Sequence, residues 1–87
     1  SEGALFENAV FSSLLRRGDV NYYQRKNGAE IDFIVDKEHA YEVKLMPSPR
    51  DVKQLESLAG ELGMEKWHII SKHYTNLKNC AYGFMTE

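Results

Sequence analysis

Apolar side chains recur at helical spacing near the start of the chain. Within residues 3–17, Phe6, Val10 and Leu14 follow one another at intervals of four, so their side chains fall on one face of a helix. Gly18 follows directly, and glycine is the usual residue where a helix ends in a left-handed conformation. The pattern predicts an amphipathic helix over residues 3–17 that ends at Gly18.

A second helical pattern begins in the middle of the chain. Ser48 suits the N-cap, Pro49 the first helical position and Asp51 the third, because this combination satisfies the backbone groups at a helix start. Gly63 marks the expected end. The apolar stripe of this predicted helix consists of Val52, Leu55, Leu58, Ala59 and Leu62.

Between the two helices the hydrophobic pattern changes to a period of two, which is typical of strands. Residues 20–26 are rich in β-branched and aromatic side chains, and the Asn27-Gly28 pair after them is a strong hairpin signal. Residues 29–36 then alternate. Ile31, Phe33 and Val35 are expected on one face of this strand, with Glu30 and Asp32 on the other.

The third predicted strand, residues 40–46, repeats the alternation. Tyr41, Val43 and Leu45 share one face, so Glu42 and Lys44 share the other. Taken alone, Glu42 and Lys44 are compatible with an ion pair on a solvated face. The alternative is a catalytic carboxylate and ammonium held side by side, and residues elsewhere in the chain must decide between them.

Residues 66–72 predict a fourth strand, and residues 80–85 predict a weaker fifth strand at a sheet edge. A strand, a helix and a strand in succession favour a right-handed parallel crossover. The element order α-β-β-β-α-β predicts an α/β domain in which helices flank a mixed sheet. Residues 1–87 are expected to form one domain, and the absence of an initial methionine suggests a fragment of a longer protein.

Composition narrows the classes of function. The chain has eleven Lys and Arg against thirteen Asp and Glu, giving a net charge of -2, so strong binding to DNA by this domain alone is not expected. The single cysteine, Cys80, excludes an internal disulfide and fits a cytoplasmic protein. No apolar run is long enough to span a membrane. The exposed edge at residues 80–85 could pair with a second copy of the chain.

Four polar residues carry the candidate chemistry. Asp32 and Glu42 lie on consecutive predicted strands, Lys44 follows Glu42 on the same face, and Glu7 borders the apolar stripe of the first helix. Clustered carboxylates repel each other, and a divalent cation with a preference for oxygen ligands removes that conflict. Mg²⁺ or Mn²⁺ at such a site activates water for phosphodiester hydrolysis. By contrast, the three histidines lack the sequence spacing of metal ligands.

These strings carry a resemblance to a known family. Glu7, Asp32 and the Glu42-Val43-Lys44 segment, in this element order, resemble the PD-(D/E)XK nuclease-like superfamily, which includes many restriction enzymes and Holliday junction resolvases. The strings "GALFENAV", "YYQRKNGAEIDFIV" and "YEVKLM" are most similar to the nuclease-like domain at the C-terminal end of many archaeal and bacterial AAA+ ATPases. The resemblance implies a restriction-endonuclease-like core and an associated ATPase module.

The resemblance also implies roles for individual residues. Asp32 and Glu42 would be the principal metal ligands, and the carbonyl of Val43 would add a third oxygen. Lys44 would act on the attacking water, and Glu7 would orient a ligand or a metal-bound water. In related nucleases a glutamine and a later tyrosine often occupy the following helix. Gln54 matches the first position, whereas Leu58 replaces the tyrosine.

Three functions therefore remain open at the level of sequence. The first is a Mg²⁺-dependent deoxyribonuclease whose DNA binding is assisted by a partner domain or a dimer. The second is a nuclease-fold module without catalysis that mediates DNA or protein interactions of an ATPase. The third is a structural domain with exposed acids. The retained Asp32, Glu42 and Lys44 favour the first over the third, whereas the negative net charge and Leu58 favour the second over the first.

Overall fold

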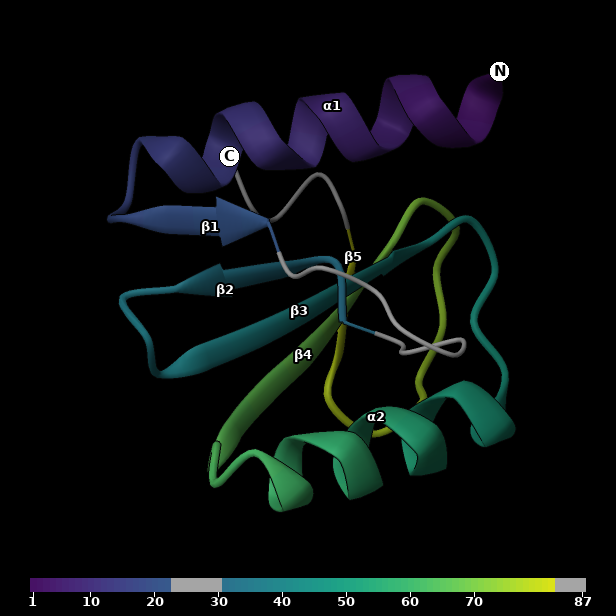
Figure 1. Ribbon diagram of the computed structural model, residues 1–87. Helices are drawn as coiled ribbons and strands as arrows, with labels where there is room; N and C mark the ends of the chain where they lie inside the picture. The colour runs from purple at the N-terminus through teal and green to yellow at the C-terminus, as the bar shows by residue number, and fades with distance from the viewer. Residues whose placement is uncertain (23–30, 83–87) are drawn as a thin grey trace.

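The computed structural model describes residues 1–22 and 31–82, which form a mixed sheet between two helices (Figure 1). The predicted α/β class is confirmed. The predicted Asn27-Gly28 turn and Glu30 lie outside the described residues. The elements are α1 (Glu2–Leu15), β1 (Val20–Tyr22), β2 (Phe33–Val35), β3 (His39–Lys44), α2 (Pro49–Glu61), β4 (Lys66–Ser71) and β5 (Cys80–Tyr82).

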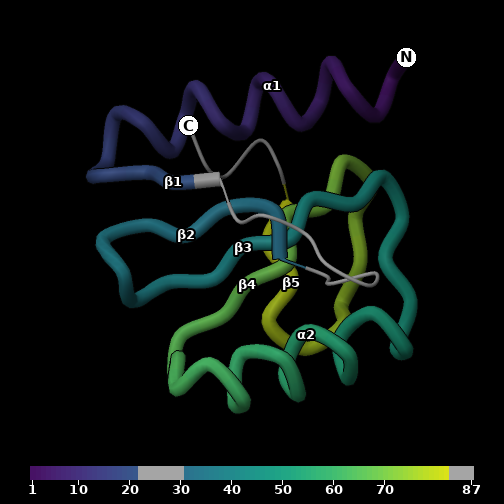
Figure 2. The backbone as a smooth tube through the Cα atoms, viewed as in Figure 1, coloured from purple at the N-terminus to yellow at the C-terminus, as the bar shows by residue number. Residues whose placement is uncertain are grey.

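The described strands lie in the sheet in the order of the chain, β1-β2-β3-β4-β5. The first three strands pair antiparallel, whereas β3–β4 and β4–β5 pair parallel. The predicted meander and the parallel connection through α2 are therefore confirmed (Figure 2). The predicted fifth strand is confirmed at the edge for Cys80–Tyr82, and its continuation to residue 85 lies beyond the described part.

Each helix covers one face of the sheet, so the domain has two hydrophobic cores (Figure 1). Alternating side chains of the same strands point into one core or the other. The core beneath α1 contains Val10, Leu14, Phe33, Val35 and Ile70. The core beneath α2 contains Ile31, Ala40, Val52, Leu55, Ala59, Trp67 and Ile69.

The predicted start and end of the first helix need correction. Ser1 is the N-cap, and its hydroxyl accepts a hydrogen bond from the Ala4 N–H at 3.2 Å. The helix ends at Leu15, two residues before the predicted end. Gly18 does not have a positive φ, so it is not a left-handed terminator. It is instead required by a close approach of Asp36, whose carboxylate would lie 2.6 Å from an added Cβ.

The second helix follows its sequence signals closely. Ser48 and Asp51 form a reciprocal capping box, with Pro49 at the first helical position. Gly63 has φ +73°, the left-handed conformation expected beyond a helix end. Leu62 departs from the predicted stripe because 41% of it is exposed.

The alternation predicted for residues 29–36 does not extend to its first apolar residue. Phe33 and Val35 lie in the core beneath α1, but Ile31 lies in the core beneath α2. Strand β2 begins only at Phe33, so Ile31 precedes the strand and need not follow its alternation. Asp32, between Ile31 and Phe33, bonds to the backbone of β3 through both its N–H and its carboxylate.

Candidate functional site

Glu42 and Lys44 point to the same side of the sheet, as their spacing predicts. On β3, Tyr41 and Val43 pack against the core beneath α1, whereas Ala40 belongs to the core beneath α2. Glu42 and Lys44 are two and four residues after Ala40, so they face α2. The carboxyl end of β3 thus directs a carboxylate and an ammonium toward the helix that follows it.

Asp32 is held beside this segment by two hydrogen bonds to β3. Its N–H donates to the Tyr41 carbonyl at 2.8 Å. Its carboxylate accepts the Val43 N–H at 2.7 Å, and only 4% of the residue is exposed. This second bond places the Asp32 carboxylate next to the peptide that joins Glu42 to Val43. The two predicted acidic ligands therefore come from adjacent segments of the sheet.

Glu42 is almost completely buried, with 1% of its surface exposed. It pairs with Ile69 on β4, and Ile69 pairs in turn with Cys80 on β5. Burial raises the pKa of the Cys80 thiol, and the negative charges of Asp51 and Glu42 raise it further. Both carboxylates therefore lie within electrostatic range of Cys80, on the side of the sheet covered by α2.

Lys44 is held at the start of α2. Its Nζ lies 3.7 Å from Asp51 Oδ1, while Asp51 Oδ2 accepts the Ser48 N–H at 2.8 Å. Sequence reasoning identified Asp51 as a capping residue only and missed its contact with Lys44. The available signal was the parallel crossover, because a helix that returns across the sheet begins near the end of the strand before it.

Glu7 comes from the opposite side of the sheet. It is partly buried on α1, which packs on the face formed by Phe33 and Val35. An ion pair between Glu2 Oε2 and Lys72 Nζ, 2.6 Å apart, ties the first turn of α1 to the chain just after β4. The structure therefore places Glu42 and Lys44 on the α2 side of the sheet and Asp32 against the backbone of β3. The role of Glu7 stays a prediction.

The arrangement offers few protein ligands to a divalent cation. Within residues 1–22 and 31–82, no three His, Cys, Asp or Glu side chains form a group able to hold a metal. Mg²⁺, however, is commonly bound by one or two carboxylates and completed by water and substrate phosphates. Asp32 and Glu42, two buried carboxylates on adjacent segments of the sheet, supply the number of carboxylates that such a shell needs. Ligation by the Val43 carbonyl and any role of Gln54 stay predictions.

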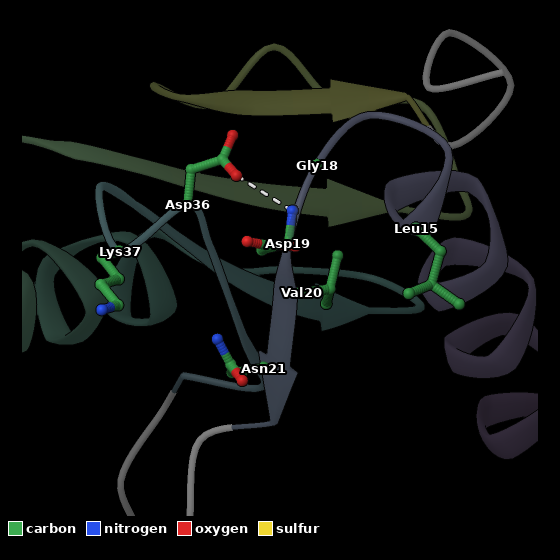
Figure 3. A pocket seen from close by; sticks show the side chains of 7 residues that line it. All are labelled: Leu15, Gly18, Asp19, Val20, Asn21, Asp36 and Lys37. Carbon is green, nitrogen blue, oxygen red and sulfur yellow. Dashed lines mark hydrogen bonds between the residues drawn. The ribbon is translucent and has the colours of Figure 1, made fainter.

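A hollow of about 550 Å³ lies elsewhere, between the α1–β1 connection and the β2–β3 turn (Figure 3). The carboxylate of Asp36 points across it and accepts the Asp19 N–H at 2.9 Å. This bond fixes the β2–β3 turn to the chain before β1. The hollow does not include Asp32, Glu42 or Lys44, and we assign it no part in the candidate chemistry.

Comparison with known proteins gives one family. A family model described as a domain of unknown function, DUF4143, matches residues 2–84. The chain belongs to the DUF4143 family. No match was found among curated proteins or among solved structures. Neither helix in the described part of this DUF4143 domain has the length and apolar character needed to cross a bilayer.

Proposed function

We propose that this DUF4143 domain is a Mg²⁺- or Mn²⁺-dependent phosphodiester hydrolase that acts on DNA. The observation that carries the proposal is the burial of two carboxylates at β3: Asp32, which accepts the Val43 N–H, is 4% exposed, and Glu42 is 1% exposed. Lys44 lies on the same side of β3 as Glu42. Burying carboxylates costs free energy, and a small domain has little stability to spare. A cation bound by these carboxylates would offset that free-energy cost.

Each candidate residue would have a separate role in the hydrolysis. Asp32 and Glu42 would hold the cation, which when bound supplies Lewis-acid polarisation of the phosphodiester and activation of water. Lys44 would hold the attacking water and stabilise the negative charge that develops on the phosphate oxygens. Water adds to phosphorus and the bond to one sugar oxygen breaks, leaving a phosphate monoester and a hydroxyl. Asp51 keeps the Lys44 ammonium near the end of β3.

DNA binding would need help from outside the domain. The net charge of -2 gives no general attraction for a polyanion. DUF4143 domains are often associated with AAA-type ATPases, and a covalently linked ATPase module would supply the missing affinity. A second copy of the domain could serve the same purpose.

The metal site is tested first, by calorimetric titration of Mn²⁺ and Mg²⁺ into the wild-type domain, Asp32→Asn and Glu42→Gln. We expect a binding heat in the wild type that is lost in both variants, because each removes a carboxylate charge while preserving its size. Asp32→Asn also keeps an acceptor for the Val43 N–H, so the fold is retained. Glu38→Gln, an exposed change in the β2–β3 turn, is the matched control and should bind as the wild type does.

Catalysis is tested with branched, single-stranded and duplex DNA in the presence of Mg²⁺ or Mn²⁺. We expect Lys44→Ala to reduce cleavage by about a hundredfold or more, which is the size typical of losing one group that stabilises charge in the transition state. Lys53→Ala, an exposed change on α2, should cleave normally. Cleavage that persists unchanged in Lys44→Ala would point to a contaminating nuclease and would contradict the proposal.

A second function is favoured by the charge of the domain. A nuclease-fold module without catalysis could mediate DNA or protein interactions of an ATPase, and the excess of acids over bases suits that role better than autonomous DNA cleavage. Metal binding without cleavage of any of the three DNA forms, in the domain and in its ATPase-linked form, would select this alternative.

A further inference from the structure

Two histidines that are distant in sequence meet on the α1 side of the sheet. His39 begins β3 and His68 lies on the parallel neighbour β4, where it pairs in register with Tyr41. The Nδ1 atom of His39 lies 3.2 Å from the Nε2 atom of His68. Both side chains are partly exposed. The sequence does not indicate this pair, because the two rings are brought together only by the register of two parallel strands.

Tyr41 fixes the orientation of the pair. Its ring stacks on His68 with centroids 4.8 Å apart. The two imidazoles meet edge to edge through their nitrogens, with centroids 5.4 Å apart and planes 21° apart. The three rings therefore form one layer along the two strands. A ring held between neighbours loses little freedom when it binds a ligand, which favours binding over a pair of mobile surface histidines.

The separation of the two nitrogen atoms matches that of two ligands on one metal ion. Zn²⁺ binds imidazole nitrogen at about 2.0–2.1 Å in tetrahedral geometry, which places two such nitrogens about 3.3 Å apart. The observed 3.2 Å also permits a direct hydrogen bond when one imidazole carries the proton. A metal ion and this shared proton therefore compete for the same two lone pairs.

Burial and neighbouring charges determine whether the proton or the metal is favoured near neutral pH. Burial lowers the pKa of His68, and the positive charges of His39 and Lys66 lower it further. His68 is thus mainly neutral at pH 7, the form that binds metals. Lys66 Nζ lies 3.7 Å from Glu38 Oε2, which offsets part of its repulsion of a cation. Arg17 acts on the adjacent Tyr41 and adds some repulsion.

We propose that His39 and His68 form a binding site for a divalent transition-metal ion of the Zn²⁺ or Cu²⁺ class. In the described residues no third His, Cys, Asp or Glu completes the shell, so water or a donor from a bound molecule occupies the remaining positions. Imidazole nitrogen favours these ions over Mg²⁺. The pair lies across the sheet from Glu42 and Lys44, so this proposal is independent of the proposed hydrolase.

The test is titration of the 87-residue domain with Cu²⁺ at about pH 7.5, where imidazoles are largely neutral, followed by electron paramagnetic resonance. We expect a Cu²⁺ signal with hyperfine coupling from two imidazole nitrogens. His39→Asn and His68→Asn should each weaken binding about tenfold or more, because each removes one of two protein ligands. His73→Asn, at the exposed third histidine, should leave binding unchanged.

Two further results separate metal binding from the alternatives. Affinity should fall sharply at about pH 5.5, because protons compete for the imidazoles. The signal of two imidazole nitrogens should persist in Asp32→Asn, which removes a proposed Mg²⁺ ligand only. Wild-type binding no tighter than that of the His39→Asn/His68→Asn double variant would overturn the proposal, leaving the pair as a hydrogen bond. Circular dichroism of each variant checks that the fold is retained.

Discussion

At the scale of single residues, Asp36 shows how one side chain can determine the identity of another. Asp36 and Lys37 both have positive φ, as the two central residues of a type I′ turn do. The Asp36 N–H donates to the Asp19 carbonyl at 2.8 Å while its carboxylate accepts the Asp19 N–H. The carboxylate then lies against Gly18, where there is no space for a side chain.

Gly18→Ala should therefore destabilise the domain. The new methyl would lie 2.6 Å from both carboxylate oxygens of Asp36, so the carboxylate must move and its bond to Asp19 is lost. We expect a decrease of about 1–2 kcal/mol in the free energy of unfolding, the usual size for a strained contact and a lost hydrogen bond. Urea denaturation followed by circular dichroism measures it.

Gly60→Ala is the matched control. Gly60 lies within α2, and an added Cβ there meets nothing within 4 Å. Alanine favours the helix over glycine, so this variant should be more stable than the wild type by about 0.5–1 kcal/mol. Equal effects at both glycines would contradict the role assigned to Asp36.

At the scale of elements, the start of α2 serves both the fold and the candidate site. The capping box formed by Ser48 and Asp51 ends the loop after β3, and the same Asp51 contacts Lys44. A change that loosens this helix start would therefore affect stability and also the position of the Lys44 ammonium.

Ser48→Ala should lower the free energy of unfolding by about 1 kcal/mol, because the N–H of Asp51 loses its cap. Ser57→Ala, an exposed change within the same helix, should be neutral or slightly stabilising, because alanine is the better helix former. Thermal unfolding of both variants measures the difference. A loss of similar size at Ser57 would show that the cap contributes nothing.

The elements also show which features could be predicted from sequence. The start and end of α2, predicted from Ser48, Pro49 and Gly63, are confirmed. The shared face of Glu42 and Lys44, predicted from the alternation along β3, is also confirmed. Both predictions depend only on residues that are close in sequence. The prediction that Ile31 shares a face with Phe33 and Val35 is wrong, because β2 begins only at Phe33 and the period of two does not reach Ile31. The contact of His68 with His39 depends on the register of two strands, and the contact of Asp51 with Lys44 depends on where α2 begins relative to β3. Neither contact could be predicted without the tertiary structure.

At the scale of the whole molecule, burial of one titratable ring makes stability depend on pH. Desolvation is the first cause of the lowered pKa of His68 in the fold, and His39 and Lys66 add to it. The unfolded chain therefore binds a proton at a higher pH than the folded domain does. Protonation favours the unfolded state, so stability should decrease as the pH falls below about 6.5, the ordinary value for histidine.

His68→Gln should flatten this dependence. Between about pH 7 and pH 5.5, the wild type should lose more stability than the variant does, because the variant has no proton to take up on unfolding at this position. His73→Gln, at an exposed histidine, should behave as the wild type. Urea midpoints at the two pH values measure the effect, and identical losses in all three proteins would contradict it.

The order of the strands has a consequence for how quickly the domain is assembled. Each strand in the described sheet pairs with the strand before or after it in the chain, so loop closure during folding always joins neighbouring segments. The sheet can thus extend from one strand to the next, with the connection through α2 as its longest step. Proteins rich in such short-range connections fold fast for their size, and we expect this domain to refold within milliseconds.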